Sequence, residues 1–128
     1  MSYMKKMEEL TMVKTAIVMN GSENISVFPT FILGSTACAV GNDVVIFVPP
    51  AGAPAMKKGV LEETTGKGMP DLMELLAGFE ALGGRILVCE LAFDALDMKE
   101  EDFREGVEIV GATTFLTEIQ DATITFSF

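Results

Sequence analysis

Five short runs rich in Val and Ile alternate with segments of helical pattern along this chain. Parallel strands need a long crossover, usually a helix, to bring the chain back to the same end of the sheet. The alternation therefore predicts an α/β protein, a three-layer α/β/α sandwich around a mostly parallel five-stranded sheet with right-handed connections. The expected strands are 13–19, 43–48, 85–89, 107–110 and 122–126.

The segments between these runs carry helix signals. A helix over 26–40 has Pro29 in its first turn and Gly41 to stop it, and Pro70 and Asp71 suit the start of a helix that ends near Gly83. Shorter helical segments are expected at 90–96, 99–104 and 113–120. Residues 51–68 are expected to be mostly loop, with a helical turn near 53–57.

Length and charge restrict the class of protein. With 128 residues, 49% of them hydrophobic, the chain fits one domain over 1–128, in which residues 1–11 are expected to be disordered or an appended helix. A net charge of −10 disfavours nucleic acid and membrane surfaces as partners. The chain has no His, the usual general base and metal ligand, so we predict no metal and no cofactor.

The two cysteines are Cys38 and Cys89, and neither belongs to a CxxC pair. Widely separated cysteines without ligand spacing suggest reduced thiols, and no signal peptide or membrane span is evident, so a cytoplasmic location is expected. Cys38 lies among small residues of the first helix, where a packing role is expected.

Cys89 stands at a more informative position. It ends the third expected strand, and open α/β sheets place their chemistry at the carboxyl ends of their strands. A helix start after the strand would stabilise a thiolate, whereas the carboxylates of Glu90 and Asp94 would oppose it. The sequence leaves the net direction open, and a packed, inert thiol remains the alternative.

The loops at the same edge of the sheet predict the lining of a pocket. The loop after the first strand could offer backbone N–H groups to an anion, although it lacks a phosphate-binding glycine pattern. The long loop after the second strand brings local positive charge, or merely solubilises the surface. The candidate pocket and anion-binding residues are Asn20, Gly21, Ser22, Lys57, Lys58 and Lys67.

The expected helix over 26–40 carries no charge on any face. A sheet buries only one face of a helix, so a chargeless helix implies a second burial surface, most simply another subunit. We therefore predict a homo-oligomer.

Several motifs resemble one known family. Their residues are 35–41 leading into 44–47, Gly68-Met69-Pro70 before a helix, 82–91 with Asp94 and Met98 after it, and 106–112. Together they resemble the DsrE/DsrF-like sulfurtransferase superfamily, including its small members labelled peroxiredoxin-like. The PxxxTxxC pattern of true peroxiredoxins is absent around both cysteines.

The resemblance implies a flavodoxin-like, DsrEFH-like sandwich that forms trimers or hexamers. It also implies that Cys89 accepts sulfane sulfur as a persulfide and passes it to a protein partner in a sulfur relay. The acidic residues around Cys89 depart from what a thiolate prefers. The alternative is a non-enzymatic protein that binds a small anion or nucleotide, with Cys89 structural; a flavin carrier fits less well, since no phosphate loop is evident.

Overall fold

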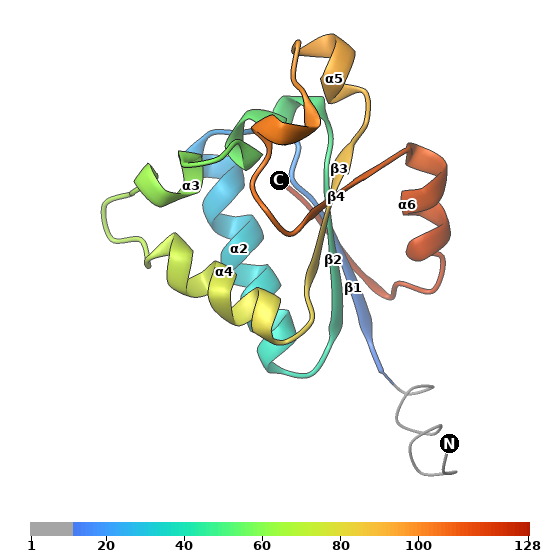
Figure 1. Ribbon diagram of the computed structural model, residues 1–128. Coiled ribbons are helices and arrows are strands. Elements are labelled where there is room, and N and C mark those ends of the chain that lie inside the picture. Colours follow the sequence, from blue (N-terminus) through green and yellow to red (C-terminus); the bar gives the residue numbers. More distant parts are fainter. Residues whose placement is uncertain (1–11) are drawn as a thin grey trace.

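The protein is described by a computed structural model over residues 12–128; residues 1–11, expected to be disordered or an appended helix, lie outside this range. Five strands form one sheet in the order β4-β3-β2-β1-β5, and every neighbouring pair is parallel (Figure 1). This confirms the predicted parallel sheet. The strands are β1 (Lys14–Val18), β2 (Asp43–Val48), β3 (Arg85–Cys89), β4 (Val107–Val110) and β5 (Ile124–Ser127).

Helices cover both faces of the sheet, which confirms the three-layer architecture (Figure 1). One face carries α2 (Asn24–Ala39), α3 (Val60–Glu63) and α4 (Leu72–Ala81), and the other carries α6 (Ala112–Glu118). The one-turn helix α5 (Ala92–Ala95) and the 3₁₀ segment η2 (Glu100–Asp102) connect β3 to β4. Within residues 12–128, no helix is long and apolar enough to cross a membrane.

The segment 51–68 is more ordered than the expected loop. It holds the 3₁₀ helix η1 (Pro50–Met56) and then α3. Two prolines preset helical φ angles in η1, while Ala53, Ala55 and Met56 are buried and so fix the segment against the sheet. Tertiary burial, which local composition does not show, produces the difference.

Helix α2 begins two residues earlier than expected, so Pro29 lies beyond its first turn. Pro29 cannot donate to the carbonyl of Ile25, but Ile25 is 81% exposed and water can serve that carbonyl. Gly41 ends the helix as predicted, with φ of 96°, and its N–H donates to the Cys38 carbonyl.

The uncharged helix α2 finds its second burial surface inside the chain, because it packs against α4 as well as β1 and β2. Phe31 of α2 meets Phe79 of α4 edge to face, with the ring centroids 6.5 Å apart. Hence the lack of charge on α2 does not by itself require another subunit, and the oligomer stays a prediction.

Two separate clusters of buried side chains form the core, one on each face of the sheet. The larger cluster fills the space between the sheet and α2, α3 and α4, with Ile17, Phe31 and Phe79 all 0% exposed. The smaller cluster lies under α6 and contains Val45, Phe47, Leu87, Cys89 and Phe115. Many more side chains are therefore buried on the face under α2, α3 and α4 than on the face under α6.

Candidate functional site

Cys89 is the last residue of β3, at the carboxyl edge of the sheet. Parallel pairing sets it beside Val110 of β4, and the N–H of Glu90 extends the ladder by donating to the Val110 carbonyl at 2.9 Å. Backbone pairing on both sides of β3 therefore holds Cys89 in place. Its side chain is 5% exposed.

The thiol belongs to the smaller cluster, on the face that α6 covers. Phe115 of α6 stacks on Phe47 of β2, with ring centroids 4.3 Å apart and the ring planes 16° from parallel. This stack fixes α6 over the cluster. The cover of Cys89 on this face is thus one helix of seven residues.

Two cations near the amino edge of the sheet hold the carboxyl end of α6. Lys14 donates to the Glu118 carbonyl at 2.7 Å and lies 3.1 Å from the carboxylate of Asp121. Arg85 bonds Glu118 at 2.9 Å and binds Glu108 of β4 through two hydrogen bonds. The hydrogen bonds from Arg85 lower the pKa of Glu108.

Glu90 and Asp94 are exposed, and α5 is a single turn that starts three residues after Cys89. A helix this short has a small dipole, so its contribution to a thiolate at Cys89 is small. The Glu90 carboxylate lies against Gly111, where an added Cβ would meet Oε1 at 3.1 Å. It therefore sits at the turn between β4 and α6.

Cys38 lies on the other face of the sheet. Its side chain is 4% exposed in the larger cluster, and its Sγ lies 3.8 Å from the Phe79 carbonyl oxygen. Burial raises the pKa of the Cys38 thiol, and the charge of Asp43 raises it further. A neutral, packed thiol is what this environment favours.

The loop holding Asn20, Gly21 and Ser22 is occupied by contacts within the chain. The Asn20 N–H donates to the Phe128 carbonyl at 3.2 Å, which extends the pairing of β1 with β5. Gly52 of η1 packs so closely on this loop that an added Cβ would lie 2.3 Å from the Met19 carbonyl oxygen. The loop therefore supports η1, which caps the carboxyl edge here.

The three candidate lysines are exposed. Lys57 forms a backbone bridge with Phe103, and the N–H of Lys58 donates to the Asp102 carbonyl at 3.0 Å. Phe103 belongs to the larger cluster, on the face of the sheet away from Cys89. Lys67 lies in the exposed turn before α4.

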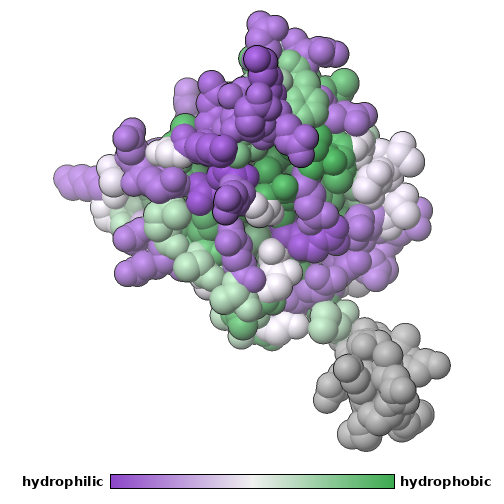
Figure 2. Space-filling model, in the orientation of Figure 1, coloured by the Kyte–Doolittle hydropathy of each residue, from purple (hydrophilic) through white to green (hydrophobic). Residues whose placement is uncertain are grey.

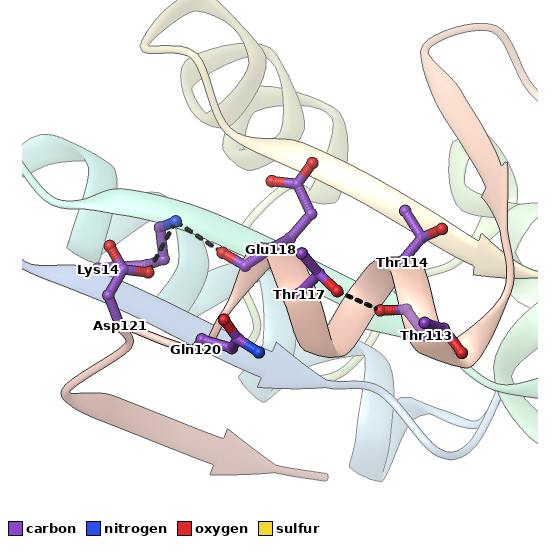
Figure 3. A pocket seen from close by; sticks show the side chains of 7 residues that line it. All are labelled: Lys14, Thr113, Thr114, Thr117, Glu118, Gln120 and Asp121. Carbon is purple, nitrogen blue, oxygen red and sulfur yellow. Dashed lines mark hydrogen bonds and ion pairs between the residues drawn. The ribbon is translucent and has the colours of Figure 1, made fainter.

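Cys89 does not line any of the three most prominent hollows on the surface of residues 12–128. The largest, about 610 Å³, runs along the polar side of α6 (Figure 3). Its described lining is Lys14, Thr113, Thr114, Thr117, Glu118, Gln120 and Asp121.

Sequence reasoning missed the residues that place α6 over Cys89, namely Phe115, Arg85 and Glu118. One signal was present, since Phe115 is an isolated aromatic residue among threonines in a short helical segment. The partner of Arg85 could not be inferred, because Glu118 lies 33 positions further along the chain.

The sequence of this chain matches the model of one protein family. The model of the DsrE/DsrF/DrsH-like family matches residues 50–126, which include Cys89 and make up more than half of the chain. The chain belongs to this family.

Two curated proteins are similar to this chain. An uncharacterised protein of Methanocaldococcus jannaschii, MJ0760, is 30% identical over 87% of this chain, which spans 39% of that longer protein. The sulfur carrier protein DsrE2 of Allochromatium vinosum is 25% identical, over 80% of this chain and 89% of the carrier.

Solved structures share the fold. The YchN protein of E. coli matches with a TM-score of 0.74 at 21% identity, over 91% of this chain and all of YchN. MTH1491 of Methanobacterium thermoautotrophicum, a protein of unknown function, matches with a TM-score of 0.67 at 12% identity, over 89% of this chain and 96% of its own. At these identities the likeness concerns the fold.

Proposed function

We propose that this protein is a sulfur carrier that holds sulfane sulfur as a persulfide on Cys89 and passes it to a partner protein. The observation that carries the proposal is the place of Cys89, at the carboxyl end of a central parallel strand and under a single short helix. Membership of the DsrE/DsrF/DrsH-like family and the distant relation to the DsrE2 carrier support it.

The transfer is an exchange at sulfur. The Cys89 thiolate attacks the outer sulfur of a donor persulfide, R–S–SH; the donor S–S bond breaks, the Cys89 S–S bond forms, and the donor leaves as a thiolate. A second thiolate takes the sulfur from Cys89 in the same way. Nothing is oxidised or reduced overall, and the proton first lost from the Cys89 thiol goes to solvent or to the partner, because the chain has no His.

The buried thiol must be uncovered before a donor can reach it, because Cys89 is 5% exposed. Local opening is least costly where few apolar contacts hold an element, and α6 rests on the smaller cluster alone. A docked partner that shifts α6 would expose the sulfur only during transfer, which protects a persulfide from solvent thiols and oxidants.

Mass spectrometry after incubation with a persulfide donor tests the proposal. We expect Cys38→Ser to gain one sulfur atom on Cys89, and Cys89→Ser to gain none. Release of that sulfur by a small thiol shows that it is sulfane sulfur. The two cysteines are buried to the same degree, so each variant is a matched control for the other. Absence of the adduct from Cys38→Ser would refute the proposal.

We further propose that the carrier works as a homo-oligomer, a trimer or hexamer, in a reducing compartment such as the cytoplasm. Exposed apolar side chains on and beside α2 and α4 support an interface there; they are Ile25, Val40 and Leu82. Light scattering at micromolar concentration should give a mass several times 13.8 kDa. A stable monomer would contradict this.

A further inference from the structure

The connection from β3 to β4 projects beyond the carboxyl edge of the sheet, directly after Cys89 (Figure 1). It runs from Glu90 through α5 and η2, and only a few of its side chains are buried. Any protein that approaches the sulfur of Cys89 from this edge meets the projection.

Apolar side chains on the projection are left open. Leu91 is 64% exposed and Leu96 is 40% exposed, one at each end of α5. Val110, the strand neighbour of Cys89, is half-buried at the base. Figure 2 shows a hydrophobic area beside this projection with hydrophilic residues around it. We use the name α5 surface for these three apolar residues together with the acidic residues Glu90, Asp94 and Asp97.

The charge around these apolar residues is strongly acidic. Residues 90–105 hold seven acidic and two basic side chains. The net charge of this segment, seven negative against two positive, is half of the −10 of the whole chain. The carboxylates nearest to Leu91 and Leu96 along the chain are those of Glu90, Asp94 and Asp97. Among the residues that the structure describes, none of these three carboxylates forms an ion pair.

The α5 surface is held in one conformation. Met98 is 5% exposed and anchors the segment in the larger cluster. Asp97, just before it, has φ of 50°, the one left-handed residue other than glycine in the described part of the chain. Asp tolerates this conformation, which persists only where neighbouring contacts fix it. The surface is therefore preorganised for binding.

We propose that the α5 surface docks a basic partner protein, which presents Lys or Arg side chains around an apolar centre and exchanges sulfur with Cys89. This rests on the proposed function. Charge complementarity identifies the partner, because a positive surface would be steered to these unpaired carboxylates and would gain apolar contact with Leu91 and Leu96. A second copy of this chain that docked through the same surface fits poorly, since it would bring the same carboxylates against one another.

Binding can be measured apart from sulfur chemistry in the Cys89→Ser protein. The probe is a fluorescent peptide of lysines and leucines at low ionic strength, and its matched counterpart has glutamate in place of lysine. We expect the lysine peptide to bind and its affinity to fall about tenfold in Asp94→Asn/Asp97→Asn. The control Glu63→Gln/Glu74→Gln removes two exposed charges from α3 and α4 and should leave the affinity unchanged.

Two leucine substitutions at similarly exposed positions test the apolar part of the α5 surface. Leu91→Ser should weaken binding several-fold, whereas Leu116→Ser, at a residue 61% exposed on α6, should not. Equal affinities in the two charge variants, or binding of the glutamate peptide, would overturn the proposal. Loss of self-association in Asp94→Asn/Asp97→Asn would also overturn it, by making the surface a subunit contact. If Cys89 accepts a persulfide but the peptide does not bind at the α5 surface, the docking proposal alone is refuted. If the peptide binds there but Cys89 accepts no persulfide, the proposed sulfur chemistry alone is refuted.

Discussion

Each face of the sheet buries one cysteine, and the two are exposed to nearly the same small extent. The two thiols differ in how easily they can be uncovered. Cys38 belongs to α2 and lies at 4% exposure against α4, in a cluster that contains most of the core. Cys89 lies at 5% exposure under α6, in a cluster of five buried residues. Exposure alone would rank the two thiols as equals. What differs is how much structure must move to reach each of them.

The difference follows from how the chain is divided between the faces. Three successive crossings, from β1 to β4, leave α2, α3 and α4 on one face, and the single return from β4 to β5 leaves α6 on the other (Figure 1). Local opening free energies are lowest where few apolar contacts are lost. The α6 face can therefore open while the other face stays folded.

We call the face of the sheet under α2, α3 and α4 the thick face and the face under α6 the thin face. The largest effect on stability should come from a substitution on the thick face. Phe31→Ala removes a ring that is 0% exposed and packed edge to face on Phe79, so it should lower the free energy of unfolding by about 4 kcal/mol. Thr36→Ala, at an exposed position of the same helix, should change it by less than about 0.5 kcal/mol. Urea denaturation measures both. A cost for Phe31→Ala as small as that of its control would mean that this face is not the stable one.

A somewhat smaller loss, with a local consequence, is expected on the thin face. Phe115→Ala removes the ring stacked on Phe47 and should cost about 3 kcal/mol, the low end of the range for Phe, because the ring lies near the surface. The same change should speed alkylation of Cys89 roughly tenfold, since α6 opens more often. Peptide mass mapping after timed alkylation gives the rates for both cysteines.

The comparison between the faces depends on the controls in that experiment. Leu116→Ala, at a 61% exposed position of α6, should leave both rates unchanged. In Phe115→Ala, the rate at Cys38 should stay far below the rate at Cys89, because Cys38 becomes accessible only when the whole domain unfolds. If the two cysteines reacted at the same rate, global unfolding would be the route to each thiol, and the distinction between the faces would be lost.

Sequence patterns predicted the elements of this fold well. The ends of β2, β3 and β4 fall where the apolar runs begin and end, because turn residues flank each of these runs. The parallel sheet followed from the alternation, and the position of Cys89 at its carboxyl edge followed from the sheet. These are local signals.

Long-range relations were beyond the same reasoning. Period-2 alternation puts Cys89 on one face of β3, but nothing local says that this face is the one α6 covers. The uncharged α2 predicts a second burial surface, but nothing local says that α4 supplies one within the chain. Nor does local sequence show that Lys57 and Lys58 make backbone contacts with Phe103 and Asp102, more than forty positions further along the chain.

The smallest expected effect concerns the ion pairs that hold α6. Arg85→Gln removes hydrogen bonds to Glu108 and Glu118, and because the three side chains are 33–45% exposed it should lower the free energy of unfolding by only about 1 kcal/mol at neutral pH. It should also raise the alkylation rate of Cys89 a few-fold. Arg104→Gln, which breaks the pair with Glu62 on the thick face, should leave that rate unchanged.

The pH dependence of this effect has a definite sign. Hydrogen bonds from Arg85 hold the pKa of Glu108 below its ordinary value of 4.5, so the pair stabilises the fold above that pH and loses its contribution as the pH falls through the lowered value. The stability difference between the unaltered protein and Arg85→Gln should therefore be constant near neutrality and shrink below about pH 4.5. Urea titrations across this range measure it. A difference that persisted under acid would mean that Arg85 holds α6 by packing of its stem rather than by charge.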